Sequence, residues 1–302
     1  MVEWVESEDD TEGKGAVSMV TSLYGTVTDV EAFFTDLDLG QGAFASLGER
    51  KRNSMVYTFR RCIAAWFTDI HKRNSGPTLY SDLTIQMAPG DCVVSFNYDT
   101  ALDAELVRQG MFRVCDGYGF HSTWDELPSD VMLLKLHGSI NWCGEIGLPR
   151  AGSASAGVRI IGPSVDNREG ILPVYPHVIL DTRSRQGGMI DSSVTMVLPT
   201  CEKRFAIQTS VGDEWKQVFD GLWNLAEDFL SQSDRSVLIG YSMPGADERA
   251  SELLLHKSNR HALLNLCCGT ATHELEARFR GAGFSRINTL ADPSFQGFLA
   301  AR

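Results

Sequence analysis

The stretch Val131-Met-Leu-Leu-Lys-Leu-His-Gly-Ser-Ile-Asn-Trp142 decides the fold of this 302-residue chain. Its apolar run, residues 131–136, is short and continuous, which predicts a buried strand that stops at His137 and Gly138. A second run of this kind, Asp91-Cys-Val-Val-Ser-Phe96, follows Pro89-Gly90. We expect it to form a strand buried on both faces, as strands of a parallel sheet are.

Helical and strand patterns alternate along the rest of the chain. Apolar residues at helical spacing predict helices, and short apolar runs bounded by turn residues predict strands. The expected helices start after the cap Asp29 and continue at 54–70, 100–109, 214–231, 246–257 and 273–282, and the further strands lie at 174–180, 195–198, 236–239 and 262–268. The alternation predicts an α/β fold: a Rossmann-like, mostly parallel sheet with helices on both faces.

One large domain is expected between two terminal segments. Residues 1–27 form an acidic flexible leader, because they carry little that a core could bury. The domain covers 28–285, begins with a helical part at 28–75, and contains a loop or insertion at 144–170 that is rich in Gly, Ala, Ser and Arg. Residues 286–302 are expected to be a C-terminal tail.

The net charge of the chain is −12, from 27 Lys+Arg and 39 Asp+Glu. Nonspecific binding to nucleic acid or to an anionic membrane needs clustered basic residues, so we expect neither partner. No apolar run approaches the roughly 18–20 residues of a membrane span. An anionic ligand would therefore be held by a local pocket of backbone donors.

Seven cysteines are present, with irregular spacing and no C-x-x-C pair. An odd number without a signal peptide indicates reduced thiols in a cytoplasmic protein. A four-thiolate zinc site is not expected for the same reason, so most of these cysteines are interpreted as small buried apolar residues.

Polar residues follow three of the expected strands, at the edge where ligands bind in parallel sheets. Asn97 and Asp99 follow the first. Either they cap the free N–H groups of the next helix, or Asn97 offers a donor and an acceptor to a ligand while Asp99 orients an amide.

His137 follows the second strand, beside Gly138, which permits close approach of another group. Its near-neutral titration makes it the best general base in the chain, and the alternative is a structural hydrogen-bond donor. Gly240 and Ser242 follow the third strand, with Asp247 just beyond. They suit a phosphate or ribose contact, or else a plain Gly-Pro turn.

Taken together, these blocks resemble the sirtuin-like superfamily, specifically its bacterial, zinc-free branch. VVSFNYDTALD resembles the T-x-N-Y-D-x-x-x-E segment of that branch, with Asp103 or Glu105 at the last position. LLKLHGSINW is close to K-L-H-G-S-x-N-W and is the most specific match. VLIGYSMPGAD resembles I-G-Y-S-L-P-x-x-D, and the resemblance covers roughly residues 90–280 in the right order.

The resemblance implies a Rossmann-type fold with NAD, as substrate, in a cleft beyond the strand ends. Asn97 would contact the nicotinamide ribose, Asp99 the nicotinamide carboxamide, and His137 would act as general base at the ribose hydroxyls. Gly240 and Ser242, with Gly138 near the base, would complete the binding residues. The absence of paired cysteines removes the zinc module of peptide deacylases from the expectation.

One part of the family pattern is missing. The first strand of the family carries a G-A-G-x-S loop that cradles the pyrophosphate, and the only candidate here, residues 13–18, follows an acidic segment and is interpreted as coincidental. We therefore expect a fold without its first βα unit. A late start of the sequence, a loss of full NAD binding and a partner that covers the gap remain alternatives.

The resulting hypothesis is an NAD+ glycohydrolase that releases nicotinamide, as this branch supplies to anti-phage defence. Two alternatives are a noncatalytic module that binds NAD or ADP-ribose or serves as a scaffold, and an NAD-dependent protein deacylase. The expected partners are NAD or ADP-ribose, with a second copy of the chain or a defence-system protein as the candidates for a macromolecular partner.

Overall fold

The computed structural model describes residues 27–73, 78–113, 116–119, 129–146, 156–160, 194–196, 198, 212–245 and 247–301, together with residues 18 and 22. The chain divides into two compact units, where the sequence predicts one domain over 28–285. Unit 1 takes Met1–Gly76 and Pro89–Asp220, and unit 2 takes Pro77–Ala88 and Gly221–Arg302. Helices and small parallel sheets occur together, so the α/β class is confirmed.

Unit 1 opens with helices and continues with strands. Its elements are α3 (Val30–Leu39), η1 (Gly42–Phe44), α4 (Glu49–Arg73), β1 (Cys92–Ser95), α6 (Ala101–Arg108), η2 (Asp116–Tyr118), β2 (Met132–Lys135), β3 (Gly138–Ile146), β4 (Ala156–Ile160) and β5 (Val194–Met196). The long helix α8 (Gly212–Gln232) crosses the boundary between the units.

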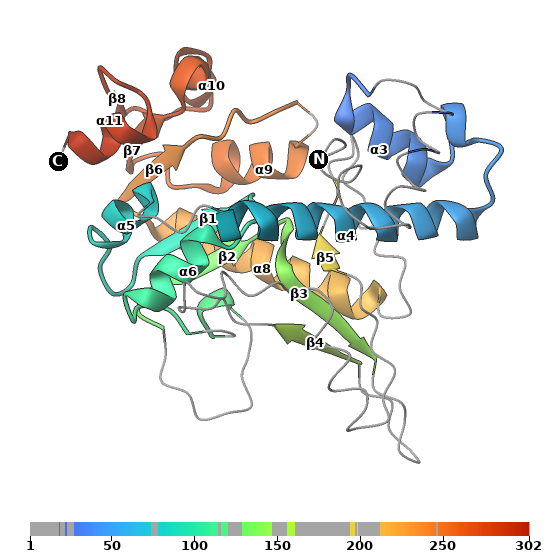
Figure 1. Ribbon diagram of the computed structural model, residues 1–302. Helices are drawn as coiled ribbons and strands as arrows, with labels where there is room; N and C mark the ends of the chain where they lie inside the picture. The colour runs from blue at the N-terminus through green and yellow to red at the C-terminus, as the bar shows by residue number, and fades with distance from the viewer. Residues whose placement is uncertain are drawn as a thin grey trace. The chain divides into compact units, whose positions relative to one another are not determined.

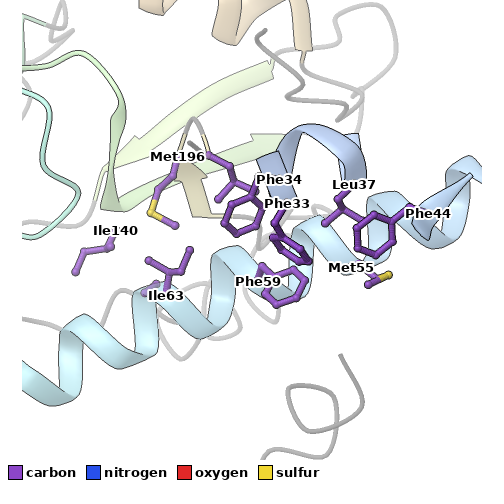
Figure 2. Close-up of a cluster of buried hydrophobic side chains, with 11 residues drawn as sticks. Phe33, Phe34, Leu37, Phe44, Met55, Phe59, Ile63, Ile140 and Met196 are labelled. Carbon is purple, nitrogen blue, oxygen red and sulfur yellow. The ribbon is translucent and has the colours of Figure 1, made fainter. Parts of the chain in front are cut away.

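The helical part of unit 1 forms an aromatic core. Asp29 caps α3 as predicted, because its carboxylate accepts a hydrogen bond from the Ala32 N–H at 2.9 Å. Figure 2 shows the Phe33 and Phe34 side chains of α3 facing Phe59 of α4. Ring centroids lie 5.6 Å and 5.7 Å from that of Phe59 in edge-to-face geometry, which fixes α3 on α4.

Strands β1 and β2 pair in parallel over four residues each, from Cys92 opposite Met132 to Ser95 opposite Lys135. Strand β2 is buried as predicted from Leu133 onward. Strand β1 is only half-buried along its length, so the expectation of a strand buried on both faces is wrong. In the described residues β1 has β2 as its one strand neighbour, and an edge strand keeps part of its surface accessible.

An antiparallel sheet follows directly, in the order β4-β3-β5. Figure 1 shows β3 and β4 as a long pair of arrows. Of the loop or insertion expected at 144–170, residues 144–146 and 156–160 are not loop, because they pair as the two strands of this hairpin. Its composition gave no alternation of apolar and polar residues by which a strand could be recognised.

Unit 2 is built on a three-stranded parallel sheet in the order β6-β7-β8. Its elements are α5 (Leu79–Thr84), β6 (Arg235–Ile239), α9 (Glu248–Glu252), the π-helical turn η3 (Leu253–Lys257), β7 (Leu263–Cys267), η4 (Gly269–Ala271), α10 (Thr272–Gly281), β8 (Ile287–Thr289) and α11 (Phe295–Ala300). Residues 286–302 are not a separate tail, because β8 pairs with β7 from Ile287 to Thr289 and the Phe298 side chain is buried.

Several predictions fall outside the described residues. They include most of the leader 1–27, residues 13–17 of the candidate glycine loop 13–18 and the strand expected at 174–180. Within the described part of the chain, no helix combines the length and the apolar character that crossing a membrane requires.

Candidate functional site

The carboxyl ends of β1 and β2 bring three predicted site residues to one end of a sheet. Asn97 and Asp99 lie on the segment after β1, and His137 lies in the turn after β2. Because the strands are parallel neighbours with Ser95 opposite Lys135, the segments that follow them leave the sheet side by side. Strands β1 and β2 thus place these three residues at one end of the same sheet, whereas β6, which precedes Gly240 and Ser242, belongs to a separate sheet.

Backbone and side-chain hydrogen bonds fasten the first segment to the second. The Tyr98 carbonyl accepts one hydrogen bond from the Ile140 N–H at 3.0 Å and another from the Ser139 hydroxyl at 3.2 Å. The Leu136 N–H donates to the Ser95 carbonyl at 3.0 Å. The segment that carries Asn97 and Asp99 is thereby held against the turn that carries His137.

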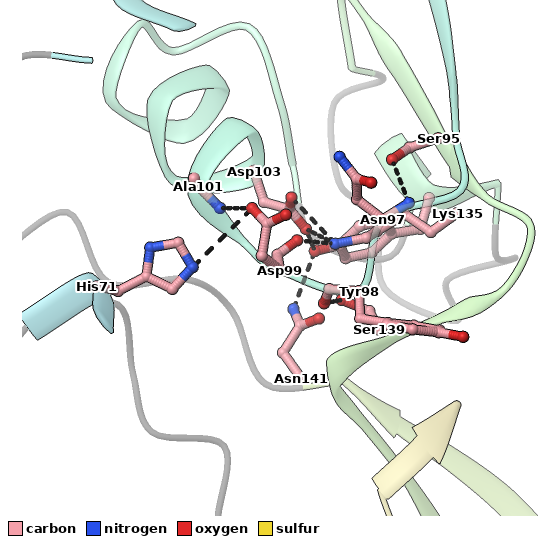
Figure 3. Close-up of polar contacts among 11 residues, drawn as sticks. His71, Ser95, Asn97, Tyr98, Asp99, Ala101, Asp103, Lys135, Ser139 and Asn141 are labelled. Carbon is pink, nitrogen blue, oxygen red and sulfur yellow. Dashed lines mark hydrogen bonds and ion pairs between the residues drawn. The ribbon is translucent and has the colours of Figure 1, made fainter. Parts of the chain in front are cut away.

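Asp99 fulfils the capping interpretation and also faces a second group. Its Oδ1 accepts a hydrogen bond from the Ala101 N–H at 3.0 Å, at the start of α6. The same oxygen lies 3.9 Å from Nε2 of His71, across from it in Figure 3. The carboxylate therefore caps a helix and contacts an imidazole through the same oxygen.

His71 is a residue of this site that the sequence did not indicate. It lies near the end of α4, its side chain is 12% exposed, and its Nε2 has no hydrogen-bond partner in the described structure. Burial lowers the pKa of His71, while the charge of Asp99 acts in the opposite direction. A lone histidine late in an amphipathic helix carries no sequence signal, because only the tertiary fold places it opposite Asp99.

His137 is enclosed rather than open to solvent. Its side chain is buried, and its ring centroid lies 5.1 Å from that of Phe96 and 6.4 Å from that of Tyr98. Gly138 has φ of 82°, a left-handed conformation that lets the chain turn from β2 into β3 directly after the histidine. Asn97, in contrast, is exposed, so it is the accessible polar group of the three.

A fully buried polar network lies under this segment. Lys135, the last residue of β2, contacts Asp103 of α6 with both carboxylate oxygens 3.3 Å from Nζ. Tyr118 donates a hydrogen bond to Asp103 and accepts one from Asn141 at 2.9 Å. Of the two acidic residues that the sequence left open, Asp103 belongs to this network, whereas the largely buried Glu105 pairs with Arg108, three residues further along α6.

Gly240 and Ser242 belong to unit 2, after β6. Gly240 has φ of 65°, and a Cβ placed there would meet no atom within 4 Å, so another group can approach its backbone closely. Ser242 is exposed. Asp247 is buried and accepts a hydrogen bond from the Tyr241 hydroxyl at 2.6 Å, which closes the loop on itself.

The cysteines that the structure describes in full are free thiols: Cys62, Cys92, Cys267 and Cys268. Among the residues described, no three or more His, Cys, Asp or Glu side chains gather in metal-ligand geometry. Burial, together with the charge of Asp91, raises the pKa of Cys92 to about 12, so this thiol stays protonated at neutral pH.

A scan of protein-family models and a search of curated proteins found no match to this chain.

Proposed function

We propose that the protein is an NAD+ glycohydrolase of the sirtuin-like type, with its reaction centre at the ends of β1 and β2 within a Rossmann-like arrangement. In the reaction, the bond between ribose C1′ and the nicotinamide nitrogen breaks, and nicotinamide leaves with the electron pair. Water forms a bond to C1′ and releases one proton, so the products are ADP-ribose, nicotinamide and a proton.

The observation that carries the proposal is the convergence of Asn97, Asp99 and His137 on segments that are hydrogen-bonded to each other. A carboxylate can accept the N–H of a nicotinamide carboxamide, an exposed amide can hold a ribose hydroxyl, and an imidazole can take a proton from a hydroxyl. Positive charge develops on the ribose during this reaction, and fixed polar groups stabilise it best when they do not have to reorganise.

A noncatalytic binding module is the second candidate, and two observations favour it. Asp99 already accepts a hydrogen bond from the Ala101 N–H, and His137 is covered by Phe96 and Tyr98. Both side chains thus have structural roles that need no substrate. Such a module binds NAD or ADP-ribose without turnover.

The deciding experiment measures nicotinamide release from NAD by the purified full chain, alone and with an acyl-lysine peptide. Asn97→Ala is the first variant, because an exposed side chain can be shortened without opening the core. His137→Ala is the second. We expect release by the wild type without peptide. His137→Ala should lower the rate by about 10²–10⁴, as removal of a positioned acid–base group does. Asn97→Ala should lower it at least about tenfold, because the ribose loses a group that positions it.

Gln41→Ala is the matched control, because Gln41 is an exposed amide in unit 1 outside the site. Equal release by wild type, Asn97→Ala and His137→Ala contradicts the catalytic proposal. Binding of ADP-ribose by titration calorimetry without any turnover identifies the binding module instead. Release that depends on the peptide identifies a deacylase.

A further inference from the structure

Lys135 is a buried charge in a position that favours an apolar side chain. It ends the strand Met132–Lys135, and its side chain and that of Asp103 are each 1% exposed. Removing both charges from water is expensive, and replacing a buried ion pair by apolar residues of similar volume is often neutral or stabilising. Stability alone therefore does not explain this pair.

The Lys135 ammonium group makes one contact that an apolar residue cannot provide. Besides Asp103, it donates a hydrogen bond to the main-chain carbonyl of Asp99. Figure 3 shows the ammonium group between Asp99 and Asp103. The preceding carbonyl, that of Tyr98, is held by Ser139 and Ile140, so two consecutive carbonyls of the site segment are fixed by residues of β2 and β3.

The other members of the network orient Asp103 for this task. Tyr118 donates to Asp103 and is itself held by Asn141, so the carboxylate is fixed by groups from η2 and β3. Burial raises the pKa of Asp103, and the Lys135 charge and the Tyr118 hydrogen bond oppose that shift. Both Asp103 oxygens nevertheless lie 3.3 Å from the Lys135 ammonium group, so Asp103 is the acidic partner of the amine buried under the site.

We propose that Lys135 is a positioning residue, whose ammonium group fixes the Asp99 backbone and thereby orients the Asp99 carboxylate and the Asn97 carboxamide towards the ligand. The inference deepens the proposed NAD site and rests on that function for its effect on catalysis. Its structural part, the immobilisation of the segment 97–101, does not depend on any ligand.

The test separates positioning from stability with a double variant, Lys135→Met with Asp103→Leu. It removes both buried charges together, so no unpaired charge stays in the core, and we expect a smaller loss of stability than in the single variant Asp103→Leu. The bond to the Asp99 carbonyl is nevertheless lost. We expect amide hydrogen exchange in segment 97–101 to become about tenfold faster or more. We also expect kcat for nicotinamide release to decrease about 10–100-fold with a smaller change in KM, because a small misplacement of reacting groups is that costly.

The matched control makes the same changes at an exposed pair, Lys257→Met with Glu227→Leu, whose charged atoms lie 3.4 Å apart. It should change neither segment exchange nor kcat. If the buried double variant fails to fold, the single variants Asp103→Asn and Lys135→Gln replace it. In Asp103→Asn, Lys135 can still donate to the Asp99 carbonyl, so the amide exchange rate of segment 97–101 should stay within about threefold of the wild-type rate. In Lys135→Gln this rate should rise by more than about threefold.

The inference is overturned if the folded double variant exchanges its 97–101 amides at the wild-type rate. It is also overturned if Asp103→Asn and Lys135→Gln exchange these amides at equal rates. If the wild type neither binds nor consumes NAD, the proposed function fails, and the exchange measurement still decides whether Lys135 holds the segment. If the wild type is active and the folded double variant keeps its kcat, the positioning role fails while the function stands.

Discussion

The polar segments after β1 in unit 1 and after β6 in unit 2 are held in different ways. In unit 1, Lys135 bonds to the backbone of Asp99, and the charge is compensated by Asp103, so fully buried side chains do the holding. In unit 2, the loop depends on backbone conformation, because Gly240 and Met243 both adopt left-handed φ angles, of 65° and 52°.

The side-chain contacts that hold the loop after β6 are single hydrogen bonds. The Tyr241 hydroxyl reaches Asp247, six residues away in the chain, and one Arg278 nitrogen donates to the Met243 carbonyl at 2.7 Å. These groups are half-buried except Asp247 and Met243. In unit 1 the segment is held by a buried charge network whose members depend on one another, whereas in unit 2 the loop is held by separate hydrogen bonds, each of which can be lost alone.

The largest effect is expected when the unit 1 network loses one charge. Asp103→Leu leaves Lys135 buried without its counter-ion, which should lower the free energy of unfolding by about 3–5 kcal/mol in denaturant titrations. Glu227→Leu breaks the exposed pair with Lys257 in unit 2 and should cost less than about 1 kcal/mol. Similar losses in the two variants would show that the buried pair does not behave as a network.

Much of the fold could be predicted from the sequence because it depends on local patterns. The Asp29 cap, the helix at 273–282 and the short apolar strands at 131–136 and 236–239 all recur in the structure within a few residues. The hairpin β3–β4 and the strand β8 could not, since neither alternates clearly and their pairing is set by neighbours far along the chain.

The candidate site was predictable only in part, for the same reason. Asn97, Asp99 and His137 could be identified because they follow apolar strands, a local signal. Lys135 did carry a signal, a charge inside an apolar run, which indicates a buried partner but not which one. His71 carried none, because its place opposite Asp99 arises from how α4 packs in unit 1.

A matched pair of tyrosine substitutions gives the next largest effect. Tyr118→Phe removes a fully buried hydroxyl that bonds to Asp103 and Asn141, so we expect a loss of about 2–3 kcal/mol in unfolding free energy. Tyr241→Phe removes one hydrogen bond from a half-buried ring, for an expected loss of about 1 kcal/mol. A larger loss in Tyr241→Phe would reverse the contrast between the two units.

Two glycine substitutions in unit 2 separate backbone strain from ligand contact. Gly240 and Gly269 both have left-handed φ angles, of 65° and 57°, and open space where a Cβ would lie. Each change to alanine should therefore cost about 1–2 kcal/mol of stability. Only Gly240→Ala should weaken ADP-ribose binding measured by calorimetry, since a phosphate or ribose that approaches this backbone would meet the new methyl group. Equal affinity in the two variants would show that Gly240 makes no ligand contact.

The smallest effect concerns pH and His71. Burial lowers the pKa of His71, whereas in the unfolded chain it titrates near its ordinary value of about 6.5. As the pH falls below that value, the unfolded chain takes up the proton more readily than the folded one, so stability decreases. The groups that act on the imidazole oppose one another: Asp99 and Asp103 favour its protonation, and Lys135 disfavours it.

His71→Gln should remove this dependence. Between pH 7.5 and 5.5 the wild type should lose up to about 1.4 kcal/mol of unfolding free energy that the variant keeps, the limit for one pH unit below the unfolded pKa. His273→Gln is the control, because His273 is exposed in unit 2 and should leave the pH dependence as it is. If the unfolding free energy of His71→Gln depends on pH as that of the wild type does, the imidazole is not buried in its neutral form. His71 then does not make the stability of the unit 1 site depend on pH, and this difference from the unit 2 loop disappears.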